Sequence, residues 1–69
     1  MTYQYTYDAY HGAGSMPAWR YVDVEMPDGT SDERAIRRCR RDAQRRGCEV
    51  RSIRRAVMVD GVTRWQPIA

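Results

Sequence analysis

The sequence contains no lysine and no phenylalanine, only one histidine and only two cysteines. All twelve basic residues are therefore arginine. Arginine codons are rich in G and C whereas lysine codons are rich in A and T, so a GC-rich genome, or a phage that lives in one, would produce this bias. Arginine content alone is therefore a weak indication of function, and the positions of the arginines matter more.

The scarcity of histidine argues against catalysis. His11 stands in a glycine-rich segment near Asp8 and Ser15. A lone histidine in such a segment is usually exposed to solvent rather than placed for acid–base or nucleophilic chemistry. The run Gly12–Ser15 lacks the lysine and the following helix of a phosphate-binding loop. We therefore predict that the protein is not an enzyme.

The two cysteines are too few for the disulfide framework of a small secreted protein. Cys39 and Cys48 are nine residues apart, a spacing that matches no zinc motif. We expect both to be small buried hydrophobic residues, and a disulfide between them is not expected in the cytoplasm. The sequence therefore predicts no metal site and no cofactor.

Long apolar runs are also absent. No segment approaches the roughly 18 apolar residues of a membrane helix, and the first ten residues lack the continuous apolar stretch of a signal peptide. These absences predict a cytoplasmic protein that does not contact a membrane, in the host cytoplasm if it is phage-encoded. A chain of 69 residues is one small domain, residues 1–69, with a modest core. A homodimer or a larger partner is therefore an expectation.

Period-two alternation of side chains predicts two strands in the first part of the chain. Thr2–Tyr7 alternates polar residues with tyrosines, and the alternation resumes over Trp19–Met26 after a loop at residues 8–18. A Pro-Asp-Gly turn at residues 27–29 ends the second strand.

The last part of the chain predicts two more strands. Residues 48–59 are rich in β-branched side chains, but Val50 is out of phase with Ile53, which predicts a bulge near Arg51–Ser52. Asp60-Gly61 predicts a two-residue hairpin turn into the final strand. The order of elements predicts an α+β fold, in which a four-stranded, mostly antiparallel sheet (β-β-α-β-β) has one amphipathic helix packed on one face.

That helix is predicted over Thr30–Arg46. Thr30 and Glu33 have the spacing of a capping box, and Gly47 fits the left-handed position that follows a helix. At 100° per residue, small apolar residues gather on one side, which we expect to pack on the sheet. These residues are Ile36, Cys39 and Ala43.

Charge is concentrated in this region. Residues 1–29 contain one arginine and four acidic residues, whereas residues 30–55 contain ten arginines and four acidic residues. A row of arginines from Arg34 to Arg45, about 16 Å long, lies on the side of the helix opposite its apolar residues. Like charges three or four residues apart destabilise a helix slightly, and no glutamate separates them here.

Guanidinium groups are always charged and bind phosphates in bidentate fashion, so the predicted partner is nucleic acid or a nucleoprotein complex. An acidic protein partner is an alternative, and so is a solvated face whose arginines reflect codon bias. The predicted contact residues are Arg34, Arg37, Arg38, Arg41, Arg45 and Arg51.

One helix covers only one face of such a sheet, and aromatic residues could occupy the other. The chain has five tyrosines and two tryptophans, so every aromatic side chain carries a polar group, which suits an interface. A homodimer interface or a second small core is the expected use, and a stacking platform for single-stranded bases is the alternative. The candidate interface residues are Tyr3, Tyr5, Tyr7, Trp19, Tyr21 and Trp65.

Four features of layout belong together: an alternating strand through Val22 and Val24, an Ala- and Arg-bearing helix from Thr30 to Gly47, a return strand through Val50 and Ile53, and a closing hairpin with Gly61 and Trp65. In size and layout the chain resembles small phage-encoded proteins, among them anti-CRISPR proteins. The resemblance implies a non-enzymatic protein that inhibits host machinery by binding crRNA-guided complexes. Many such inhibitors are acidic nucleic-acid mimics, and the basic helix departs from that pattern. A basic inhibitor would engage an acidic protein surface or the nucleic acid itself.

Overall fold

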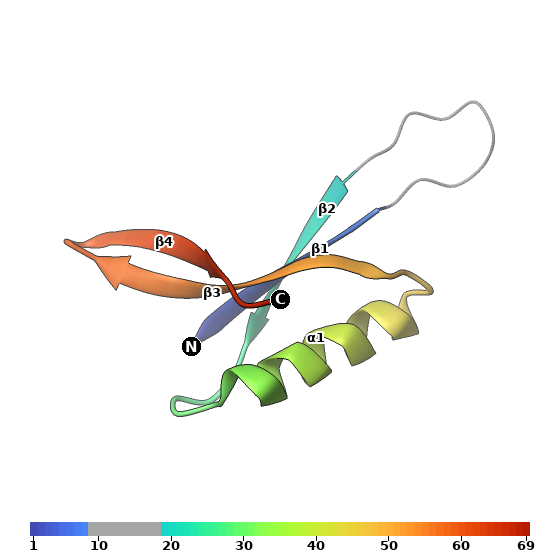
Figure 1. Cartoon of the computed structure of the whole chain (residues 1–69), viewed down its shortest axis with the longest axis horizontal. Coiled ribbons are helices and arrows are strands. Elements are labelled where there is room, and N and C mark those ends of the chain that lie inside the picture. The colour runs from blue at the N-terminus through green and yellow to red at the C-terminus, as the bar shows by residue number, and fades with distance from the viewer. Residues whose placement is uncertain (9–18) are drawn as a thin grey trace.

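The computed structural model describes residues 1–8 and 19–69. The elements are β1 (Thr2–Asp8), β2 (Trp19–Glu25), α1 (Asp32–Arg45), β3 (Val50–Val59) and β4 (Val62–Pro67). The strands form one sheet in the order β2-β1-β3-β4, each neighbouring pair is antiparallel, and α1 lies on one face of it (Figure 1). The predicted α+β fold is confirmed. The expectations about His11 and the run Gly12–Ser15 lie outside the described residues.

The core lies between α1 and the two central strands. Tyr3 and Tyr5 on β1 are both 0% exposed, and Ile53 on β3 is opposite Tyr5 and buried with it. On the other side of β1, Val24 lies opposite Tyr3 and Val22 opposite Tyr5. Tyr5 is thus flanked by aliphatic side chains on both neighbouring strands, whereas Tyr3 has Val24 on one side and Arg55 on the other.

This arrangement corrects the placement of the β1 tyrosines on the open face of the sheet. Tyr3 and Tyr5 are fully buried beneath α1, and Tyr7 is half-buried and packs against the same core. Alternation along a strand shows which residues share a face, but the pairing with β2 decides which face it is. Because the valines of β2 face the helix, the tyrosines opposite them do so too.

Small residues bring α1 close to the sheet. The buried helix residues are Ala35, Cys39 and Ala43, four positions apart. Residues at this spacing lie above one another on one side of a helix. Ile36, predicted to be buried, is only partly so, and Ala35 takes its place in the core. The large side chains that fill the core come from the sheet.

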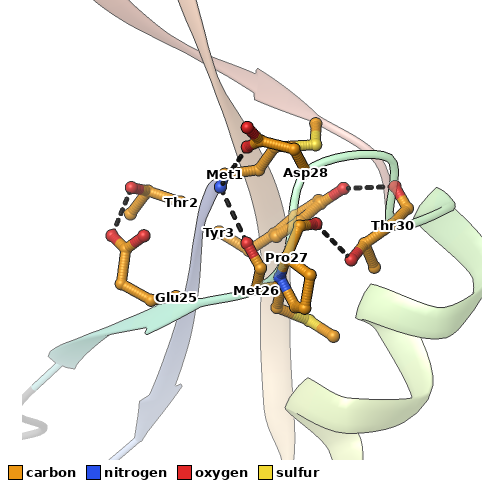
Figure 2. Close-up of polar contacts among 8 residues, drawn as sticks. All are labelled: Met1, Thr2, Tyr3, Glu25, Met26, Pro27, Asp28 and Thr30. Carbon is orange, nitrogen blue, oxygen red and sulfur yellow. Dashed lines mark hydrogen bonds and ion pairs between the residues drawn. The ribbon is translucent and has the colours of Figure 1, made fainter.

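The N-cap of the helix lies one residue later than predicted. Ser31 is the N-cap, and its Oγ accepts a hydrogen bond of 3.2 Å from the Arg34 amide. Thr30 was therefore wrongly predicted as the cap. Its hydroxyl instead donates to the Pro27 carbonyl at 2.6 Å, and its carbonyl accepts the Tyr3 hydroxyl at 3.2 Å (Figure 2). Thr30 thus closes the turn between β2 and α1 and holds it to β1.

The other end of the helix and the bulge are confirmed. Gly47 has a φ of +73°, its amide donates to Gln44, and the Cys48 amide donates to Ala43, both at 3.0 Å. This is the hydrogen-bond pattern of a Schellman motif. In β3, Val50 and Ser52 lie opposite the consecutive residues Tyr7 and Thr6 of β1, so Arg51 between them is the additional residue.

The hairpin between β3 and β4 turns at Asp60 and Gly61, whose φ angles of 50° and 77° fit a type I′ turn. Val59 lies opposite Val62, beside that turn. The pairing of β3 with β1 ends at Arg55, so the end of this hairpin extends beyond the rest of the sheet as a two-stranded ribbon (Figure 1). Among the residues described, no helix is both long and apolar enough to cross a membrane.

Candidate functional site

The outer side of α1 carries the arginine face, which we define as Arg34, Arg37, Arg38, Arg41 and Arg45. All five side chains are exposed, on the side of the helix away from the buried residues. Four of them surround a shallow hollow together with Met26, which follows β2; these are Arg34, Arg37, Arg38 and Arg41. No described element covers this side of α1 (Figure 1).

The two acidic residues of α1 that lie toward the sheet, Asp32 and Asp42, form hydrogen bonds with residues of the sheet. Asp32 accepts hydrogen bonds from Arg55 Nη1 at 2.7 and 2.8 Å, and Arg55 Nη2 also donates to Gln66 at 2.9 Å. Asp42 accepts a hydrogen bond from the Tyr5 hydroxyl and lies 3.6 Å from Arg46 Nε. Both carboxylates are thereby directed toward the sheet.

The arginine face is consequently unneutralised. Among the side chains described in residues 1–7 and 19–69, no carboxylate oxygen lies within 4.0 Å of its guanidinium nitrogens. Glu33, the exposed acid of the first turn, does not change this, because it forms no ion pair within that distance among the described residues. A row of exposed positive charge therefore runs along most of the helix.

Burial under the helix changes the ionisation of the residues that anchor it. Burial raises the pKa of Tyr5 to about 12, and the hydrogen bond to Asp42 acts in the same direction. Burial likewise raises the pKa of Cys39 to about 11. Both groups therefore stay protonated at neutral pH, and the Tyr5 hydroxyl keeps the proton with which it binds Asp42.

Arg51 does not belong to the arginine face, contrary to the prediction. Its Cζ atom lies 4.8 Å from the centroid of the Trp19 ring, on the face of the sheet opposite α1. Arg54 takes a matching position, with its Cζ atom 5.6 Å from the centroid of the Tyr21 ring. The bulge explains the error, because the additional residue in β3 places Arg51 beside Ser52 instead of on the helix side.

The predicted aromatic surface is thus divided in two. Trp19 and Tyr21 lie on the open face and are exposed, whereas Tyr3 and Tyr5 belong to the core. Trp65 is half-buried and lines a separate hollow of the open face with Met58 and the acidic residues of β2. The pairing of Trp19 and Tyr21 with arginines had no local signal in the sequence, because it joins strands that do not neighbour each other.

The described residues give no support to a metal site. Among them, no group of three or more histidine, cysteine, aspartate or glutamate side chains is placed to hold a metal ion. Cys39 is buried and Cys48 is half-buried, and both are free thiols. Cys39 is thus buried as predicted, whereas Cys48 was also predicted to be buried and is not: it follows the end of the helix, and its thiol donates a 3.5 Å hydrogen bond to the Arg46 carbonyl.

No protein-family model, curated protein or solved structure matches the chain. The fold separates two surfaces that could bind a partner. One is the arginine face of α1, and the other is the group of arginines and aromatic rings on the open face of the sheet.

Proposed function

We propose that the protein is a non-enzymatic binding protein that contacts nucleic acid, free or in a nucleoprotein complex, through the arginine face of α1. The observation that carries this proposal is the absence of a carboxylate within 4.0 Å of these exposed guanidinium groups among the described residues. An exposed arginine that lacks an internal partner retains its full capacity to bind an external anion. Phosphate is the anion whose oxygens match the guanidinium fork.

The row of charge has the length that a nucleic-acid backbone requires. From Arg34 to Arg45 the helix rises about 16 Å, and a DNA strand carries a phosphate about every 3.4 Å along its axis. Several phosphates can therefore be contacted at once. Such contacts position the protein and do not read base sequence. We also propose that the protein acts in the cytoplasm and meets the nucleic acid there.

Salt dependence gives the first test. Each neutralised duplex phosphate contributes about −0.9 to the slope of log affinity against log salt concentration, so four contacts give a slope of about −3.6. The affinity should then fall about 100-fold between 50 and 200 mM salt. We expect this slope in fluorescence anisotropy titrations of a short labelled DNA duplex. Weak binding that does not depend on salt would contradict the proposal.

Charge reversal locates the surface. The double variant Arg38→Glu/Arg41→Glu should lose measurable binding of the duplex. Its matched control is Arg20→Glu/Arg64→Glu, which alters net charge equally at exposed positions outside α1. The control should retain most of the affinity. Equal losses in the two variants would show that overall charge, and not the arginine face, determines binding.

An acidic protein is the competing partner, and nuclease treatment separates the two classes. Material captured from a cell lysate by the tagged protein should lose its bound fraction after digestion with a nuclease that degrades both DNA and RNA. If a bound protein survives digestion and is released by Arg38→Glu/Arg41→Glu, the arginine face recognises carboxylates and the proposal fails.

A further inference from the structure

The face of the sheet opposite α1 carries a second positively charged surface, which we call the sheet platform: Trp19, Tyr21, Arg51 and Arg54. The Trp19 and Tyr21 side chains are 44% and 60% exposed. The guanidinium of Arg51 lies over the first ring and that of Arg54 over the second. With Thr6 and Ser52 these four side chains line one hollow.

The platform is built by the order of the strands. Because β1 lies between β2 and β3, each arginine of β3 must extend across β1 to reach an aromatic ring of β2 (Figure 1). The floor beneath them is Thr6, which is buried and whose hydroxyl shares a 2.8 Å hydrogen bond with Ser52. The bulge allows Arg51 and Ser52 to occupy this face together, although they are consecutive residues.

The charge of the platform favours an anionic ligand. Among the side chains described in residues 1–7 and 19–69, no carboxylate oxygen lies within 4.0 Å of the guanidinium of Arg51 or Arg54. Two acids of the same face are bound elsewhere on it: Asp23 accepts a hydrogen bond of 2.9 Å from Gln4, and Glu25 accepts one from Thr2. Positive charge and flat rings therefore coincide at one end of the open face.

We propose that the sheet platform binds single-stranded nucleic acid. Bases stack on the Trp19 and Tyr21 rings, or on the guanidinium planes that lie over them, and the arginines also pair with the phosphates. Stacking requires unpaired bases, so a duplex does not fit this surface, and it tolerates any sequence because every base has an aromatic face. The platform lies across the sheet from the arginine face, so this proposal does not depend on the proposed function of α1.

The intrinsic fluorescence of Trp19 provides the test. In the Trp65→Phe protein, Trp19 is the only tryptophan. Oligomers of thymidine and of uridine, about eight nucleotides long, should quench its emission in a saturable manner. Both oligomers offer bases and phosphates to the platform. The oligomer that binds with the higher affinity shows whether the preferred ligand is DNA or RNA. Tyr21→Leu should weaken this binding about 5- to 100-fold.

Anisotropy of labelled oligomers then compares Trp19→Leu with Trp65→Leu, a tryptophan on the same face outside the platform. Trp19→Leu should weaken binding by a similar factor, and Trp65→Leu should change it less than about twofold, with circular dichroism confirming that both variants fold. Equal losses in both variants would overturn the proposal. So would oligomer binding that is abolished by Arg38→Glu/Arg41→Glu and unaffected by Trp19→Leu, or an absence of saturable quenching.

These outcomes also distinguish the two surfaces. Duplex binding without quenching by the oligomers would overturn the platform and leave the function of the arginine face standing. Quenching that depends on Tyr21, in a protein that does not bind duplex, would support the platform and contradict the proposed function of α1.

Discussion

The Tyr5 hydroxyl, on β1 in the middle of the sheet, donates a hydrogen bond to the Asp42 carboxylate on α1. This contact joins the buried side of the protein to its charged side. It holds the helix on the sheet, and it keeps a carboxylate away from the arginine face. Arg55 and Asp32 repeat the arrangement at the first turn of the helix. Stability and the exposed positive charge of α1 therefore depend on the same sheet-to-helix contacts.

Removing the Tyr5 hydroxyl should destabilise the fold. Tyr5→Phe leaves the ring in place and deprives a partly buried carboxylate of its donor, which we expect to lower the free energy of unfolding by about 1–2 kcal/mol. In a domain of this size that corresponds to a fall of roughly 5–15 °C in Tm. Thermal unfolding followed by circular dichroism measures it. Tyr21→Phe removes an exposed hydroxyl and should leave Tm nearly unchanged, and equal shifts in the two variants would contradict the role of the Asp42 contact.

Stability should fall in alkaline solution. The ordinary pKa of tyrosine is 10.0 and that of Tyr5 is about 12, so the unfolded chain loses this proton first. Cys39 behaves in the same way, from 9.0 to about 11. The stabilisation from both groups is complete below pH 9 and is lost as the pH rises through the folded pKa values. Urea unfolding from pH 8 to 12 should show this decline, and Tyr5→Phe should flatten it between pH 10 and 12.

The position of the helix cap can be tested by a pair of alanine variants. Ser31→Ala removes the side chain that accepts the Arg34 amide and should lower the free energy of unfolding by about 1 kcal/mol. Thr30→Ala removes an exposed hydrogen bond to Pro27 and should have a smaller effect, below about 0.5 kcal/mol. Urea denaturation compares the two. A larger effect for Thr30→Ala would favour the cap predicted from the sequence.

The two thiols should differ in their rates of alkylation. Cys39 is buried on the side of α1 that packs on the sheet, and its raised pKa suppresses the thiolate, which is the reactive form. Cys48 lies just beyond the helix and is only half-buried. Mass spectrometry after brief treatment with iodoacetamide at pH 8 should show one label, on Cys48, and a second label only in denaturant. Rapid labelling of both residues in the native protein would contradict the packing of α1 on the sheet.

Local signals predicted much of this fold because the responsible residues are neighbours in the chain. The positive φ at Gly47 follows from the helix that ends before it, and the hairpin turn needs only Asp60 and Gly61. The bulge was visible as a change of phase between Val50 and Ile53, which the register with β1 confirms. Thr30 and Ser31 are both good capping residues, and the choice between them depended on the turn at Pro27, which recruits the Thr30 hydroxyl.

Features that depend on pairing between distant strands were not predictable. Which face the β1 tyrosines take depends on the register that sets Tyr3 opposite Val24. The same applies to the candidate site. The exposure of the arginine face followed from helical periodicity, whereas the position of Arg51 over Trp19 required the strand order β2-β1-β3.

Arg51, the additional residue in β3, determines what a change of length in this strand would do to the two faces of the sheet. Deleting Arg51 would restore strict alternation and leave Val50 and Ile53 two positions apart, so both would stay on the helix side and the core would be kept. The open face would change instead, because Arg51 would no longer lie over Trp19. We expect any homologue that lacks this residue to keep an apolar residue at the position of Val50 and to lose this contact with the ring. Length variation elsewhere, at the Asp60-Gly61 turn for example, would leave the contact between Arg51 and Trp19 in place.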